Sequence, residues 1–87
     1  MNRKLINIGF GSFVMIDKII SIVNPDSAPI KRLVQNAREN DRLIDATYGR
    51  KTRAVIIIST GQIILSGIQV ETIAGRMENN EEREKTK

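Results

Sequence analysis

The chain has 87 residues, a formal net charge of +4, and neither cysteine nor histidine. This length allows one domain. The absence of cysteine excludes disulfides and thiol chemistry. The absence of histidine removes the commonest general base and metal ligand. No apolar run approaches the roughly 18 residues of a membrane span. No carboxylates have a catalytic or metal-binding spacing, so we expect a soluble, cytoplasmic, non-enzymatic protein without cofactor, metal, membrane or small-molecule partner.

The positive charge is concentrated in the part of the chain that is predicted to fold. Residues 1–75 carry ten basic and six acidic side chains, whereas residues 76–87 carry four of each. We expect one folded domain over residues 1–78. Residues 79–87 are polar and are predicted to form a disordered tail, which is not the source of the excess charge.

The first quarter of the chain has the pattern of short strands. Residues 5–8, 13–16 and 19–23 are rich in β-branched or apolar side chains, as strands are. Between the first two lies Gly9-Phe10-Gly11, which lacks the third glycine and the following helix of a dinucleotide-binding fingerprint. We therefore interpret it as a turn.

A helix is predicted after residue 27. Asp26 or Ser27 can cap its first turn, where Pro29 is tolerated because its missing N–H would be unpaired there. Its apolar stripe has the helical spacing i, i+3, i+4, i+7 and consists of Ile30, Leu33, Val34 and Ala37.

Basic and polar side chains flank that stripe. At 100° per residue, Lys31, Gln35, Arg38 and Arg42 fall within about 60° of one another. They are either an ordinary solvated helix face or a second ridge that contacts phosphate groups, and the sequence leaves both interpretations open.

The second half of the chain predicts further strands over residues 43–47, 52–58 and 62–66, and a helix from Val70 to Met77. Thr60-Gly61 is typical of a hairpin turn. Residues 54–58 are apolar without alternation, so both faces of that strand should be covered, by the helices, a curled sheet or another subunit. The fold class is α+β, a small antiparallel or curled sheet of five to six strands with two short helices.

The loop between the strands at 43–47 and 52–58 is the leading candidate site. Its segment Tyr48-Gly49-Arg50-Lys51-Thr52-Arg53 holds three cations within six residues. We expect it to join adjacent antiparallel strands, with Gly49 at positive φ. No acidic residue lies between Ala46 and Val70, so no local carboxylate neutralises the cluster, and phosphate is the expected partner.

The side chains of this loop differ in what they can do. Arg50 suits bidentate contacts to phosphate or guanine, and Lys51 supplies a point charge. Tyr48 can bond a phosphate or stack on a base, although we favour an ordinary half-buried strand tyrosine. Arg53 either joins the cluster or pairs across strands with Asp45.

Three segments resemble the RemA family of small bacterial regulators of extracellular-matrix (biofilm) genes. They are residues 7–11, 25–32 and 43–55, and the resemblance covers about residues 4–75. It implies a transcriptional regulator that binds duplex DNA and assembles into a homo-oligomeric ring. The family's Tyr-Gly-Arg-Arg segment, which contacts DNA, matches Arg50 and position 51, where lysine replaces the second arginine.

The predicted DNA-binding residues are therefore Arg50, Lys51, Arg53 and Tyr48, with Lys31 and Arg38 from the helix. Two alternatives to a DNA-binding regulator remain. One is an RNA-binding module, disfavoured by the scarcity of aromatic side chains for stacking. The other is a self-assembling scaffold that binds protein partners through its basic surface.

Overall fold

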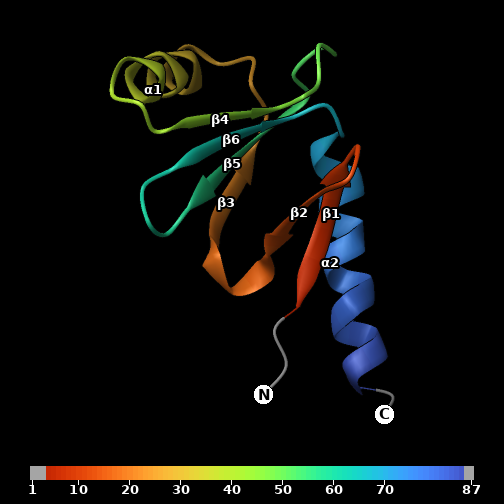
Figure 1. Cartoon of the computed structure of the whole chain (residues 1–87). Helices are drawn as coiled ribbons and strands as arrows, with labels where there is room; N and C mark the ends of the chain where they lie inside the picture. The colour runs from red at the N-terminus through yellow and green to blue at the C-terminus, as the bar shows by residue number, and fades with distance from the viewer. Residues whose placement is uncertain (1–3, 86–87) are drawn as a thin grey trace.

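The computed structural model describes residues 4–85, with side chains described as far as Asn79. Within these residues, three strands precede the first helix and three more precede the second, in an α+β arrangement (Figure 1). In chain order they are β1 (Leu5–Gly9), β2 (Ser12–Met15), a 3₁₀ turn η1 (Ile16–Lys18), β3 (Ile19–Val23), α1 (Ala28–Glu39), β4 (Leu43–Ala46), β5 (Ala54–Ile58), β6 (Ile63–Ser66) and α2 (Val70–Lys85). The predicted α+β class is thus confirmed, with the helices and strands in the predicted order.

The strands form two sheets rather than one. Strands β1 and β2 make a separate antiparallel hairpin, and the other four have the order β3-β5-β6-β4. The turn η1 separates them, because the 3₁₀ helix at Ile16–Lys18 interrupts the extended chain between β2 and β3. In Figure 1 the hairpin lies beside α2, apart from the larger sheet.

The predicted pairing of the strands on either side of the basic loop is wrong. Strand β4 pairs in parallel with β6, from Leu43 opposite Ile63 to Ala46 opposite Ser66, and β5 pairs with β6 in the antiparallel sense. Strand β6 therefore separates β4 from β5. The predicted β5–β6 hairpin is confirmed, with Gly61 at φ +100°. The tight turn pairs β6 with β5, and β3 occupies the other edge of β5. Strand β4 therefore pairs with the remaining edge of β6.

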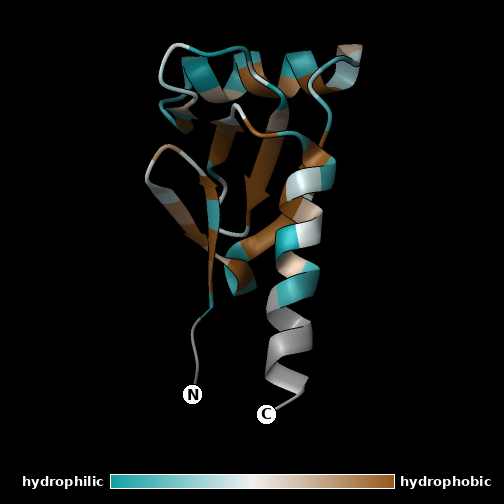
Figure 2. Cartoon of the chain, turned by 90° about the vertical axis from the view of Figure 1, so that its right-hand side faces the viewer, coloured by the Kyte–Doolittle hydropathy of each residue, from teal (hydrophilic) through white to brown (hydrophobic). Residues whose placement is uncertain are grey.

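Both faces of β5 are covered, as predicted, and the same chain supplies the cover. Ala54, Ile56 and Ile58 belong to a buried cluster with residues of β1 and α2. Val55 packs in a second cluster beneath α1. Figure 2 shows hydrophobic strands in the interior of the molecule and both hydrophilic and hydrophobic residues along the helices. A second subunit is not needed to cover this strand.

Side-chain hydrogen bonds stabilise both ends of helix α1. Ser27 caps it, since the Ser27 hydroxyl accepts a hydrogen bond from the N–H of Ile30 at 3.4 Å. Arg42 lies beyond the end of the helix, which corrects its predicted place on the basic ridge. Its guanidinium donates to the Gly61 carbonyl and to Asn36 Oδ1, at 2.8 and 2.7 Å, and so ties α1 to the β5–β6 turn.

Helix α2 continues to Lys85, past the residue at which we predicted the folded domain to end. Side chains from residue 80 onward lie outside the described part of the chain, as do residues 86 and 87 altogether. The predicted boundary at residue 78 and the tail of residues 79–87 thus remain predictions. Neither helix within the described residues combines the length and apolar character needed to cross a membrane.

Candidate nucleic-acid interface

The basic loop starts with a tight turn directly after β4. The carboxylate of Asp45 accepts hydrogen bonds from the N–H and the hydroxyl of Thr47, at 3.0 and 2.6 Å. The N–H of Arg50 donates to the Thr47 carbonyl at 3.1 Å. Between them Tyr48 and Gly49 have φ angles of 54° and 82°, the signs that a type I′ turn requires. The predicted positive φ of Gly49 is confirmed.

The Asp45 carboxylate is stabilised in its charged form. The hydrogen bonds from the side chain and the backbone of Thr47 lower the pKa of Asp45 below its ordinary value, and the nearby charge of Arg38 lowers it further. Thr47 is buried, so the pair fixes the start of the loop. The alternative in which Asp45 pairs across adjacent strands with Arg53 is excluded, because β6 lies between β4 and β5.

Arg50 lies on an aromatic side chain from another part of the sequence. Its guanidinium carbon is 3.8 Å from the centroid of the Phe10 ring, at the tip of the β1–β2 hairpin. The Tyr48 ring meets the same Phe10 ring with centroids 6.1 Å apart and a tilt of 52°. We call these three side chains the Arg50 stack. It forms because the loop after β4 and the tip of the hairpin meet at one end of the molecule.

Tyr48 does not occupy the half-buried strand position that we favoured. It lies outside β4, and 65% of its surface is exposed. Phe10 is also exposed, at 40%. The aromatic surface next to Arg50 is therefore accessible to a ligand.

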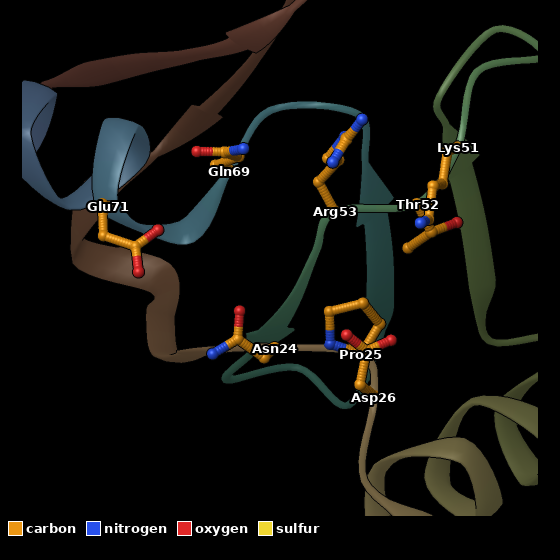
Figure 3. A pocket seen from close by; sticks show the side chains of 8 residues that line it. All are labelled: Asn24, Pro25, Asp26, Lys51, Thr52, Arg53, Gln69 and Glu71. Atoms are coloured by element: carbon orange, nitrogen blue, oxygen red, sulfur yellow. The ribbon is translucent and has the colours of Figure 1, made fainter.

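Lys51 and Arg53 lie on a different side of the loop. They line a polar pocket of about 390 Å³ together with Thr52 and with residues of the β3–α1 and β6–α2 connections. Figure 3 shows these side chains, which are Asn24, Pro25, Asp26, Lys51, Thr52, Arg53, Gln69 and Glu71. The loop therefore presents Arg50 and the pair Lys51 and Arg53 as two adjoining groups rather than as one cluster.

Acidic residues distant in sequence share this pocket. Asp26 precedes α1 and Glu71 lies in the first turn of α2, and both line the pocket with Lys51 and Arg53. The absence of acidic residues from the segment between Ala46 and Val70 thus does not leave those two cations without carboxylates nearby. Arg50, stacked on Phe10, is outside the set of side chains that line the pocket.

The predicted helix residues lie next to the loop. Lys31, Gln35 and Arg38 line a groove of about 190 Å³ between α1 and the sheet, and Thr52 of the loop lines it too. Gln35 also donates to the Glu39 carboxylate at 3.0 Å. The fold therefore brings Lys31 and Arg38 to the same region of the surface as Lys51 and Arg53.

Phe10 is the site residue that sequence reasoning missed. We interpreted Gly9-Phe10-Gly11 as a turn, and the structure confirms a turn, with all three residues at positive φ. Phe10 itself has φ 54°, a conformation that a bulky side chain adopts at a cost in free energy. An aromatic residue between two glycines in a hairpin turn was the available signal.

The molecule is thus a small α+β protein with a basic loop packed on an exposed aromatic hairpin tip. The chain belongs to the RemA-like family, described as extracellular matrix regulatory protein A-like, whose model matches residues 5–77. It is 58% identical over 84 residues to a protein of Halalkalibacterium halodurans, covering 97% of each chain. A protein of Bacillus cereus strain AH187 is 58% identical over 82 residues, covering 94% of each.

A third relative, from Caldicellulosiruptor saccharolyticus, is 60% identical over 81 residues, which cover 93% of this chain and 80% of that protein. All three relatives carry only the general description of a regulatory protein. The expected family is therefore confirmed, and a regulatory role is the coarse function that family membership supports.

Proposed function

We propose that this protein is a cytoplasmic, non-enzymatic transcriptional regulator of extracellular-matrix (biofilm) genes that binds duplex DNA through the loop between β4 and β5. The observation that carries the proposal is the position of Arg50. This arginine lies on the surface over the Phe10 ring, with Lys51 and Arg53 next to it in the chain. A guanidinium placed over a ring can still direct N–H groups to phosphate or base atoms.

The remaining basic residues extend this surface. Lys51 keeps the charge of the arginine expected at its position but lacks the planar fork, so its role is a phosphate contact rather than base recognition. Arg53 lies beside Lys51, and the groove next to Thr52 adds Lys31 and Arg38. Together these side chains form a path for a DNA backbone from the loop to α1.

Self-association completes the proposed mechanism. A few cations on one subunit give only weak, salt-sensitive binding, with Kd of about 10⁻⁴–10⁻⁶ M, and repeating the loop in a closed ring raises the effective concentration of each further contact. The outer strands β3 and β4 of the larger sheet carry Ile20 and Ile44, which are 65% and 47% exposed. Exposed apolar residues on edge strands are suited to pairing between subunits.

A single-stranded nucleic acid is the second candidate ligand. The accessible rings of Phe10 and Tyr48 next to Arg50 resemble the stacking platforms on which unpaired bases lie. The exposed aromatic surface therefore gives an RNA-binding role more support than the aromatic count alone did. The scaffold alternative predicts that the basic loop binds polyanions without regard to their type.

A competition titration distinguishes these candidates. A fluorescently labelled mixed-sequence DNA duplex is bound by the protein, and its anisotropy is followed as an unlabelled competitor is added. The competitors are the same duplex, one of its strands, the RNA of the same sequence, and heparin. We expect the DNA duplex to compete better than the single strand and the RNA. Stronger competition by RNA would contradict the proposal, and equal competition by heparin at matched charge would favour the scaffold.

A further inference from the structure

We propose that Phe10 is a positioning residue that orients Arg50 for DNA, an inference that rests on the proposed function of the loop. The two residues come from separate parts of the chain, yet the Arg50 guanidinium carbon lies 3.8 Å from the centroid of the Phe10 ring. The ring attracts the cation through its quadrupole and so favours the position of the guanidinium over its face. Phe10 thus acts through Arg50 rather than through a contact of its own with DNA.

The hairpin tip that carries Phe10 is anchored to the connection between β6 and α2. The buried Ser66 hydroxyl donates to the Ile8 carbonyl at 2.8 Å and accepts from the N–H of Ile68 at 3.0 Å. Gly9 has φ +110°, and a Cβ at this position would lie 2.9 Å from Ile68 Cγ1. This close approach and the two hydrogen bonds fix the place from which the Phe10 ring projects.

The Arg50 stack packs over Gly67, at the start of the β6–α2 connection. A Cβ at Gly67 would lie 3.4 Å from Phe10 Cε2 and 3.5 Å from Arg50 Cβ. These are ordinary van der Waals distances, so Gly67 lies directly beneath both side chains, where the hairpin tip and the basic loop meet over the end of β6. The consequence for Arg50 is pre-organisation, because a long, flexible side chain that is already ordered loses less conformational freedom when it binds.

Tyr48 is the second side chain of the loop that contacts the Phe10 ring. Its ring meets that of Phe10 at a centroid distance of 6.1 Å and a tilt of 52°, within the range of favourable aromatic pairs. Because Tyr48 and Arg50 both contact Phe10, removing the Phe10 ring should loosen the two functional side chains of the loop together.

A double-mutant cycle tests this role. Phe10→Leu keeps an apolar side chain with the same need for positive φ but removes the ring, and it should weaken binding of a labelled DNA duplex about 3- to 10-fold. Phe10→Tyr should bind nearly as well as the wild type. Phe10→Leu should have no further effect in an Arg50→Ala protein. Phe13→Leu, at an exposed phenylalanine outside the stack, is the matched control and should leave binding unchanged.

The salt dependence separates positioning from direct contact. Phe10→Leu should leave the slope of log K against log salt unchanged, because no phosphate contact is lost, whereas Arg50→Ala should reduce it by about 0.9 per contact. Additive effects of the two changes would show that Phe10 contacts DNA itself and would overturn the inference. The inference would also be overturned if the Phe10→Leu protein bound the duplex as tightly as the wild type.

A measurement on the free protein keeps the inference testable without DNA. The ring should shift the Arg50 side-chain proton resonances upfield in the NMR spectrum, and Phe10→Leu should abolish that shift. A shift that is absent from the wild type would contradict the stack itself. Failure of the wild-type protein to bind any duplex, with the shift present, would count against the proposed function and with it the role of Phe10 in binding.

Discussion

Asp45 shows how one side chain shapes the candidate site. Its carboxylate accepts two hydrogen bonds from Thr47 and begins the turn that carries Tyr48 and Gly49. The same hydrogen bonds lower its pKa in the folded protein. Charged acceptors form stronger hydrogen bonds than neutral ones, so the ionised carboxylate should hold the turn better than an amide of the same shape.

This predicts a pH-dependent contribution to stability. Because the folded-state pKa of Asp45 lies below the ordinary value of 3.8, its stabilisation is fully present above that pH and is lost as the pH falls through the folded pKa. The wild type should therefore have a larger free energy of unfolding than Asp45→Asn at neutral pH, and the gap should narrow in acid. Urea denaturation at several pH values measures it, and a gap independent of pH would contradict the assignment.

The residues of the site were predictable where the signal is local. The positive φ of Gly49 was predicted from one short segment and is confirmed, whereas the role of Arg50 in DNA binding stays a prediction. Phe10 was not predicted, because its contact with Arg50 depends on two loops that meet only in the folded chain. The exposure of Tyr48 was also not predicted. We assigned Tyr48 to the strand, whereas it lies in a type I′ turn after β4, at positive φ.

At the scale of elements, two predictions that rest on neighbours in sequence are confirmed. The Ser27 cap and the apolar stripe of residues 30–37 located α1, and Thr60-Gly61 located the β5–β6 hairpin. The parallel pairing of β4 with β6 was not foreseen. Strand order depends on long-range packing, and the local pattern of β4 does not indicate which strand it pairs with.

The parallel pairing of β4 with β6 changes where the basic loop runs in the fold. As a connection that passes the end of β6, rather than a hairpin turn, it reaches the tip of the β1–β2 hairpin on one side and the β3–α1 connection on the other. Arg50 and the pair Lys51 and Arg53 are consequently separated. A hairpin turn would have projected all three cations into solvent together.

At the scale of the whole molecule, residues 4–85 cover both faces of the larger sheet, and β3 and β4 are its outer strands, with no further strand paired to them among these residues. In the proposed assembly, the contacts between subunits would therefore come from β3 and β4, with Ile20 and Ile44 exposed, and not from an uncovered face of β5.

We expect the protein to form a homo-oligomer without DNA. Multi-angle light scattering at micromolar concentration should report a mass several times the 9.8 kDa of one chain, and Ile20→Lys should reduce that mass, because a charge on an edge strand opposes pairing. Ile44→Lys is the corresponding change on the opposite edge. A monodisperse monomer that binds duplex DNA tightly at physiological salt would contradict the proposed assembly.

The central claim, that the β4–β5 loop binds duplex DNA, is tested most directly by a charge-matched pair of variants. Arg50→Ala and Arg32→Ala each remove one positive charge, from the Arg50 stack and from an exposed position on α1. In an anisotropy titration with one labelled duplex, Arg50→Ala should weaken binding by about tenfold or more and Arg32→Ala only slightly, with circular dichroism spectra unchanged. Equal affinities of Arg50→Ala and the wild type would contradict the account.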